Sequence, residues 1–139
     1  MIYNRSMEVL ERRTTKYVTD IKRTLRAVGH ATNTQILDAL REAYPSISAT
    51  TVHRITQRLY EDGVIGKAPK AADGSARYDA TPEPHDHFIC VPCDSVRDIS
   101  VPVTFRTMLQ CKLDGCSIAG PLTVSGACRS CKEQLHRIA

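Results

Sequence analysis

The sequence contains no tryptophan, and aromatic residues make up only 5% of its 139 residues. Its apolar residues never form a run near the roughly 20 positions that a membrane-spanning helix needs. The first residues are charged and lack the apolar segment of a signal peptide, so we expect a cytoplasmic protein. No internal repeat or low-complexity tract is present. A chain of this length allows one medium domain or two small ones, with a modest core that a metal ion would help to stabilise.

Cysteine is absent from the first 89 residues, and all six cysteines follow. Positive charge has the opposite distribution: Lys and Arg outnumber Asp and Glu by four in residues 1–80 and equal them in residues 81–139. In a reducing compartment, CxxC pairs indicate metal ligands or redox groups. These asymmetries predict a basic domain over residues 1–80 and a metal-binding domain over residues 81–139.

Residues 1–80 have the periodicity of three helices followed by a hairpin. Residues 6–28 place four apolar side chains on one helical face: Tyr17, Ile21, Leu25 and Val28. A second helix is predicted by a capping box of Thr32 with Gln35. A third follows Ser48 and buries Val52, Ile55 and Leu59. Asp73-Gly74 is a hairpin signal. This order describes a winged helix-turn-helix, whose third helix enters the major groove.

Polar side chains on the third helix and the hairpin are candidates for DNA contact. The helix offers Thr50, Thr51, His53, Arg54, Gln57 and Arg58. The hairpin offers Lys67, Lys70 and Arg77, which we expect at phosphates. The alternative is an ordinary solvated helix and loop.

Two CxxC pairs, Cys90/Cys93 and Cys128/Cys131, are separated by 34 residues. Brought together, they form the tetrahedron of four thiolates that holds a structural zinc ion. Free thiols or a redox pair are the alternative, but no βαβ context surrounds either pair. Cys111 and Cys116 are expected as semi-buried residues in a turn, with a redox pair or extra ligands as the alternative.

A second group of candidate ligands contains imidazoles and carboxylates. His85 and His87 lie on one side of a predicted strand and Asp86 on the other. Asp79 and Asp98 flank them, and His30 lies far upstream. Such a set suits iron, manganese or zinc, although histidines and acids can also simply decorate a strand.

Three segments together resemble the ferric uptake regulator (Fur) family of bacterial metal-dependent repressors. "ISATTVHRITQRLYEDGVI" is similar to the pattern I-S-x-x-T-V-Y-R-x-L-x-x-L-x-x-x-G-L-V. "HDHFICVPCDSVRDI" resembles H-x-H-x-x-C-x-x-C-G-x-x-x-D/E, and "GACRSC" resembles G-x-C-x-x-C. The resemblance runs from about Thr15 to Cys131, nearly the whole chain.

The resemblance implies an α+β protein, with a winged-helix domain and a small α/β dimerisation domain that holds the four-cysteine zinc. It implies a homodimeric repressor of operator DNA rather than an enzyme. A regulatory Fe²⁺ or Mn²⁺ between the domains would bind His30, Asp79, His85, His87 and Asp98. Asp at positions 79 and 98 resembles the peroxide-responsive branch, in which His30 and His85 would be oxidised. Iron- or zinc-uptake regulation, or a DNA-binding protein with only structural zinc, are the alternatives.

The chain departs from the family at several positions. His53 replaces a Tyr, and an Arg of the first helix is missing, so Arg13 or Lys16 is expected to replace it at DNA. Pro84 replaces a His of an additional metal site, which we expect to be absent. Ile118, Leu122 and Val124 predict a strand at the dimer interface. A zinc deaminase is disfavoured because Val96 stands where P-C-x-x-C requires its second Cys.

Overall fold

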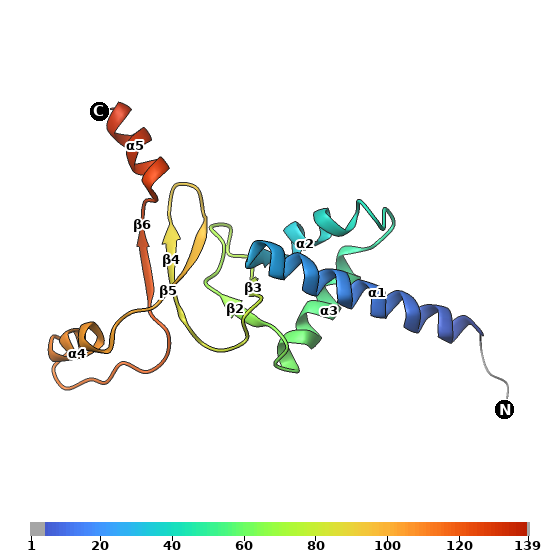
Figure 1. Ribbon diagram of the computed structural model, residues 1–139, viewed down its shortest axis with the longest axis horizontal. Coiled ribbons are helices and arrows are strands. Elements are labelled where there is room, and N and C mark those ends of the chain that lie inside the picture. The colour runs from blue at the N-terminus through green and yellow to red at the C-terminus, as the bar shows by residue number, and fades with distance from the viewer. Residues whose placement is uncertain (1–4, 139) are drawn as a thin grey trace. The chain divides into compact units, whose positions relative to one another are not determined.

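The computed structural model describes the backbone of residues 5–138 and the side chains of residues 14–135 (Figure 1). The elements are α1 (Arg5–Val28), β1 (His30–Thr32), α2 (Asn33–Leu40), α3 (Ala49–Glu61), β2 (Gly66–Ala68), β3 (Arg77–Asp79), β4 (Asp86–Cys90), β5 (Val96–Ile99), α4 (Val103–Cys111), β6 (Thr123–Gly126) and α5 (Arg129–Ile138). The predicted α+β class is confirmed.

The chain forms two compact units. Unit 1 contains the residues up to Ala68 together with Ser75–Pro82, and unit 2 contains Pro69–Gly74 and the residues from Glu83 onward. The predicted domain division at residue 80 stays a prediction. None of the described helices is both long enough and apolar enough to cross a membrane.

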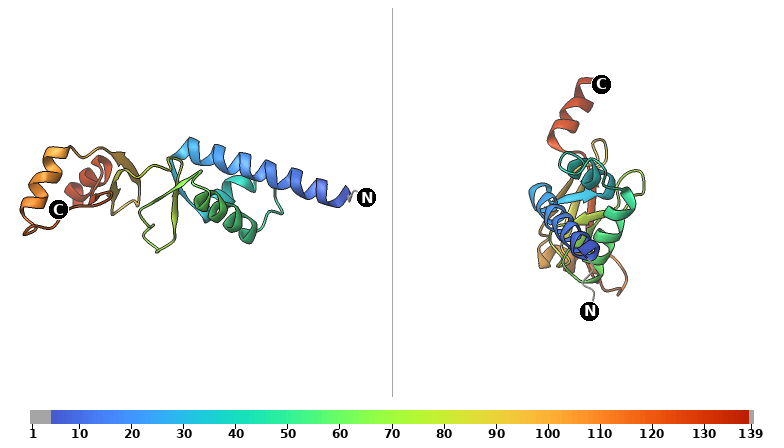
Figure 2. Two further views of the ribbon diagram at one scale, coloured as in Figure 1. Left: turned by 90° about the horizontal axis from the view of Figure 1, so that it is seen from below. Right: turned by 90° about the vertical axis from the view of Figure 1, so that its right-hand side faces the viewer.

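Unit 1 combines three helices with a three-stranded antiparallel sheet in the order β1-β3-β2. In the views of Figures 1 and 2, α1 runs along the pair formed by α2 and α3, which it contacts. The predicted caps are confirmed: Gln35 N donates to Thr32 Oγ1, and Thr51 N donates to Ser48 Oγ. The predicted turn at Asp73-Gly74 also forms, since Gly74 has φ +86° and its N–H donates to Ala71 O.

The core of unit 1 joins all three helices and the sheet. Its fully buried side chains include Ile21, Leu25, Ile36, Val52 and Tyr78. One predicted core residue is wrong: Val28 is 60% exposed. It is the last residue of α1, where the chain turns through Gly29 (φ +84°) into β1.

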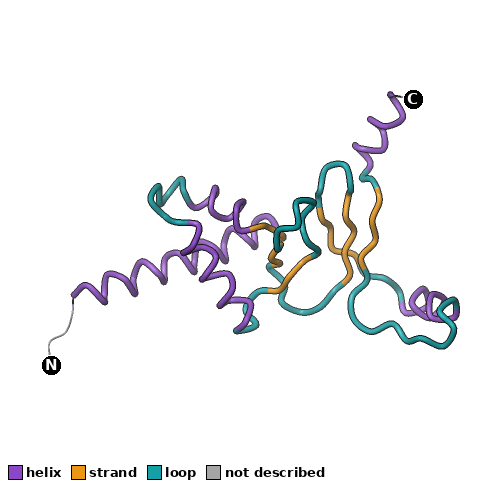
Figure 3. The backbone as a smooth tube through the Cα atoms, turned by 180° about the vertical axis from the view of Figure 1, so that it is seen from behind, coloured by secondary structure: helices purple, strands orange, loops and turns teal. Residues whose placement is uncertain are grey.

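Unit 2 is built on a mixed sheet in the order β5-β4-β6, drawn as orange strands in Figure 3. β4 is antiparallel to β5 and parallel to β6, with Cys90 opposite Gly126. In Figure 1, α5 follows the end of β6 and α4 precedes its start. The strand predicted from Ile118, Leu122 and Val124 is shorter than expected, because only Val124 of the three lies within β6.

Asp86 connects three segments of unit 2. Its carboxylate accepts hydrogen bonds from Val101 N, Leu122 N and the guanidinium of Arg106. Arg106 also donates to Gly120 O. The Arg106 hydrogen bond, with the Leu122 and Val101 N–H groups, lowers the pKa of Asp86 to about 2. As predicted, the side chain of Asp86 lies on the opposite side of β4 from the side chains of its histidine neighbours.

Candidate metal centres and recognition helix

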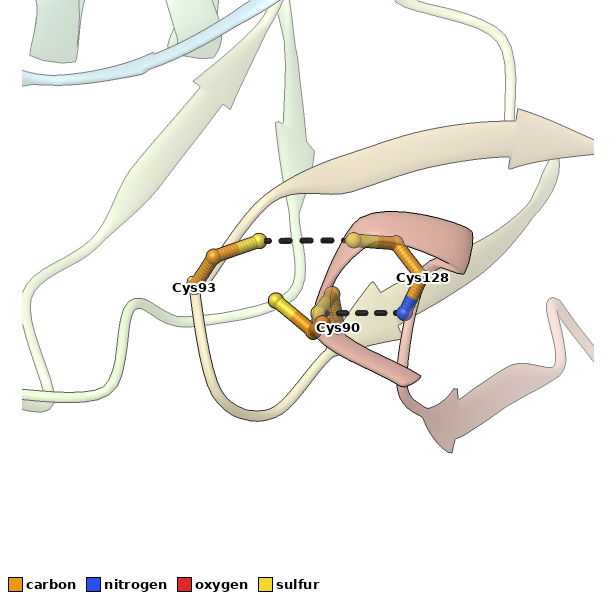
Figure 4. Close-up of side chains that lie close together, drawn as sticks. Cys90, Cys93 and Cys128 are labelled. Atoms are coloured by element: carbon orange, nitrogen blue, oxygen red, sulfur yellow. Dashed lines mark hydrogen bonds between the residues drawn. The ribbon is translucent and has the colours of Figure 1, made fainter. Parts of the chain in front are cut away.

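Four cysteines converge at one end of the sheet in unit 2. Because β4 and β6 are parallel and in register, the CxxC pairs that follow them emerge side by side. The four sulfur atoms lie within 4.8 Å of one another. Figure 4 shows Cys93 Sγ facing Cys128 Sγ at 4.0 Å. A tetrahedral zinc with bonds of about 2.3 Å requires sulfur separations of about 3.8 Å. The predicted cluster therefore forms, with a size that fits zinc.

Backbone N–H groups and mutual hydrogen bonds make these thiols unequal. The N–H of Cys128 donates to Cys90 Sγ at 3.3 Å and lowers the pKa of Cys90. The N–H of Cys131 similarly lowers the pKa of Cys128. The pKa of Cys131 is raised to about 12, first because its thiol is hydrogen-bonded to Cys128. A bound dication would favour all four thiolates and release the remaining protons.

Asp94, which replaces a family glycine after the second cysteine, has φ 57°. This left-handed conformation costs an ordinary residue about 1–2 kcal/mol, although Asp tolerates it better than most. Its N–H donates to Cys90 O, and its Oδ2 accepts from Ala72 N. The carboxylate therefore gains a contact that glycine could not make.

Cys111 and Cys116 do not join the four-cysteine cluster. Cys111 ends α4, and Cys116 follows a turn in which Asp114 and Gly115 have positive φ. Both side chains are exposed, so the prediction of semi-buried residues is wrong, although the turn is present.

Two of the five residues of the predicted His/Asp set lie in unit 1. β1 pairs with β3 so that His30 stands opposite Asp79. His30 Nε2 lies 3.3 Å from Asp79 Oδ2, and Asp79 is 1% exposed. The other carboxylate oxygen accepts from Thr81 N at 2.8 Å. This pair is a buried carboxylate and an imidazole held in fixed register.

The other three residues lie in unit 2, around one carboxylate oxygen. His85 Nε2 is 2.8 Å and His87 Nε2 is 3.4 Å from Asp98 Oδ1. His85 Nδ1 lies 2.8 Å from the carbonyl of Glu83, which can only accept, so Nδ1 carries a proton. In a neutral ring, Nε2 then has a lone pair that faces a carboxylate. Such a contact between two acceptors requires a proton or a metal cation between them.

Most of the predicted DNA-contacting side chains lie at the surface of unit 1 or on the hairpin. Those that are exposed are Lys16, Thr50, His53, Arg54, Arg58, Lys67 and Lys70; Thr51 and Gln57 are half-buried. Gln57 Nε2 also donates to Glu61, and Lys67 Nζ stacks over the Tyr60 ring at 4.4 Å. The side chain of Arg13 lies outside the described residues.

Arg77 is the exception among the hairpin predictions. It lies on β3 between β1 and β2 and is only 5% exposed. A guanidinium in this position is not available to a DNA phosphate, so the predicted contact of Arg77 is wrong. Period-two alternation could have indicated a buried side, but a three-residue strand is too short to show it.

Two polar groupings were not predicted from sequence. One is the Asp86–Arg106 connection described above. The other joins Asn33 on α2 to His53 and Thr56 on α3 by hydrogen bonds. Neither has a local signal, because the partners are 20 or more residues apart in the chain.

Comparison with known proteins agrees with this architecture. Residues 10–118 match the model of the ferric uptake regulator family. The peroxide-responsive repressor PerR of Staphylococcus epidermidis is 29% identical over 107 residues, which are 76% of this chain and 71% of PerR. PerR of Staphylococcus aureus strain NCTC 8325 is 27% identical, with 76% and 72% covered.

Solved structures share the fold. The Helicobacter pylori ferric uptake regulator Fur superposes with a TM-score of 0.68 at 21% identity, covering 91% of each chain. The Campylobacter jejuni peroxide stress regulator gives 0.67 at 20% identity, covering 94% of this chain and 100% of that one.

Proposed function

Because the chain belongs to the ferric uptake regulator family, we propose that it is a transcriptional repressor whose binding to operator DNA depends on a regulatory metal ion. The observation that carries this proposal is the contact of His85 and His87 Nε2 with one oxygen of Asp98. A metal cation between the imidazole nitrogens and the carboxylate oxygen would satisfy that arrangement as a proton would, and the winged-helix order of unit 1 supplies a DNA-binding helix. The carbonyl of Glu83, which accepts from His85 Nδ1, also orients the His85 ring, as carbonyl groups do for metal-bound histidines.

In this proposal the two residues of unit 1 and the three of unit 2 bind one ion. His30 and Asp79 would add a nitrogen and an oxygen ligand from unit 1 to the three ligands of unit 2. Neutral imidazoles and carboxylates without a thiolate suit Fe²⁺ or Mn²⁺. An ion shared by two units binds best in one relative orientation and shifts the population toward it. That coupling would make DNA affinity follow metal concentration.

The four-cysteine cluster has a structural role in this proposal. Four thiolates complete the coordination of zinc and leave no open position for a substrate, which supports a regulator over a hydrolase or deaminase. Zinc would instead stabilise unit 2, in which β4, β5 and β6 meet.

Association into a homodimer is supported by the apolar surface of unit 2. Its exposed large apolar side chains are Val91, Val103, Phe105, Met108, Leu113, Val124 and Leu135. Three of them, Val103, Phe105 and Met108, lie on α4, where exposed apolar side chains favour association with another chain. A dimer would present two α3 helices to two half-sites of an operator.

We also propose that the regulator responds to peroxide. Asp79 and Asp98 supply the carboxylates expected for that branch, and the two PerR proteins similar to this chain are peroxide-responsive. Treatment of the Fe²⁺-loaded protein with hydrogen peroxide should add the mass of one oxygen atom to the peptides of His30 or His85. Unmodified histidines after that treatment would favour iron- or zinc-uptake regulation.

The test of the shared ion uses one variant from each unit. In anaerobic gel-shift titrations, the parent protein should bind operator DNA at a lower protein concentration with Fe²⁺ or Mn²⁺ than without added metal. His30→Ala and His87→Ala should each lose this metal response while keeping one zinc per chain. Asp114→Asn, in the exposed turn after α4, is the control and should respond normally. Loss in His87→Ala alone would show that the ion is not shared, and a normal response in both would refute the site.

A further inference from the structure

Two departures of α3 from the family pattern are connected to each other through α2. The pattern given above has Tyr at the position of His53 and Leu at the position of Thr56. Thr56 is 0% exposed, and its Oγ1 lies 2.8 Å from Asn33 Oδ1. Asn33 Nδ2 lies in turn 3.2 Å from His53 Nδ1. We propose that Asn33 is a positioning residue that determines which ring nitrogen His53 presents to a DNA base.

The first step is the orientation of the Asn33 amide. Asn33 Oδ1 is the acceptor closest to the buried Thr56 hydroxyl, at 2.8 Å, whereas the carbonyls of Val52 and His53 lie at 3.1 Å, so we assign the hydroxyl proton to Asn33. The carbonyl oxygen of the Asn33 amide therefore faces Thr56, on the buried side of α3. The backbone of Asn33 is held in place because it follows Thr32, whose side chain and backbone both take part in the capping box.

The second step is the protonation of His53. With Oδ1 directed at Thr56, the amide presents its NH₂ group to the imidazole, and NH₂ can only donate. His53 Nδ1 must therefore accept, and in the neutral ring the proton resides on Nε2. The His53 side chain is exposed, so this N–H is available as a hydrogen-bond donor.

The third step is the base that such a donor selects, which rests on the proposed function of α3 in DNA binding. In the major groove, guanine offers N7 and O6, adenine offers N7 and thymine offers O4 as acceptors. Cytosine offers an N4–H₂ donor, which cannot accept from His53. The structure thus predicts that His53 discriminates against cytosine at one position of each half-site.

The tautomer is tested without DNA. In ¹⁵N spectra of the zinc-loaded, full-length protein at about pH 8, His53 Nδ1 should be unprotonated and Nε2 protonated. His53→Gln identifies its signals. Asn33→Asp should invert the pattern, because a carboxylate accepts from Nδ1–H. Thr56→Val removes the hydroxyl at nearly constant volume and should give a mixture. A protonated Nδ1 in the parent, or no change in Asn33→Asp, would overturn the proposal.

The consequence for recognition is tested on operators selected from random DNA with the regulatory ion present. Cytosine at the His53 position should weaken parent binding about 2- to 12-fold, because one N–H donor makes one hydrogen bond. Asn33→Asp should remove or reverse this preference at that position only. Thr34→Ala, an exposed neighbour on α2, should leave every base preference unchanged.

The outcomes separate the two proposals. Failure of the parent to bind any DNA would overturn the proposed function, and the ¹⁵N spectra would still decide the hydrogen-bond connection. Specific binding by the parent, with unchanged base preferences in Asn33→Asp and Thr56→Val, would overturn the role of Asn33 alone.

Discussion

Replacement of Cys131 by serine is expected to unfold unit 2 while unit 1 stays folded. Cys131 is half-buried on α5, so the loss of its sulfur removes a zinc ligand rather than a core side chain. Every residue of the described hydrophobic core cluster belongs to unit 1. Unit 2 therefore depends on the metal to compensate for the entropy of ordering its chain.

The magnitude follows from the loop that the zinc closes. Joining Cys93 to Cys128 encloses 34 residues, which costs about 3–4 kcal/mol of chain entropy. A structural zinc contributes about 10–16 kcal/mol at neutral pH. That contribution exceeds the closure cost several-fold and matches the stability of a whole domain, about 5–15 kcal/mol. Loss of the zinc should thus unfold unit 2 completely rather than loosen it.

The assay combines elemental analysis with hydrogen exchange followed by peptide mass spectrometry. Cys131→Ser should contain less than one zinc per chain, and peptides of β4, β5 and β6 should exchange fully while those of α2 and α3 stay protected. Cys111→Ser removes an exposed thiol outside the cluster and should match the parent in both measurements. Equimolar zinc or native protection of β4 in Cys131→Ser would refute the reasoning.

Four further variants test the packing and the polar contacts. Leu25→Ala should destabilise unit 1 by about 2–5 kcal/mol in urea denaturation, because Leu25 is 1% exposed. Val28→Ala should cost less than about 0.5 kcal/mol, and equal losses would contradict the assigned core. The pKa of Tyr44 is raised, first by its hydrogen bond to Asp20, so this contact stabilises the fold below about pH 10 and is lost above it. Tyr44→Phe should therefore lower the melting temperature at about pH 8 and have no effect at high alkaline pH; a constant difference would contradict the contact. Asp86→Ala should increase hydrogen exchange across unit 2, and unchanged exchange would show that its contacts with Arg106 are dispensable.

Local chemistry made part of this structure predictable. The cap of α2 depends on residues three positions apart, so Thr32 and Gln35 could be identified from sequence. The turn at Gly74 likewise depends on one residue with positive φ. The four cysteines could be grouped because few other arrangements use two CxxC pairs.

Other features depend on pairing between distant segments and had no local signal. The three-residue strand β1 places His30 opposite Asp79, and its sequence, His-Ala-Thr, does not identify a partner. The burial of Arg77 follows from cover on both faces of β3, whose three residues are all buried. The exposure of Val28 reflects the end of α1 rather than its periodicity. The regulatory ligands as one set came from the family resemblance.

Because β4 and β6 are parallel neighbours, zinc can bind all four cysteines only when the two strands are correctly aligned. A slip of one residue would displace Cys128, which follows the end of β6, by about 3.3 Å along the direction of that strand, more than the length of a zinc–sulfur bond, about 2.3 Å. A misaligned pair therefore cannot coordinate the ion with four sulfur atoms, so zinc occupancy reports correct assembly during folding. Zinc joins the ends of β4 and β6, and the segment between the two CxxC pairs, which contains α4, lies outside the cluster. A change of length around α4 would therefore act on unit 2 through the contact of Arg106 with Asp86 rather than through the zinc cluster.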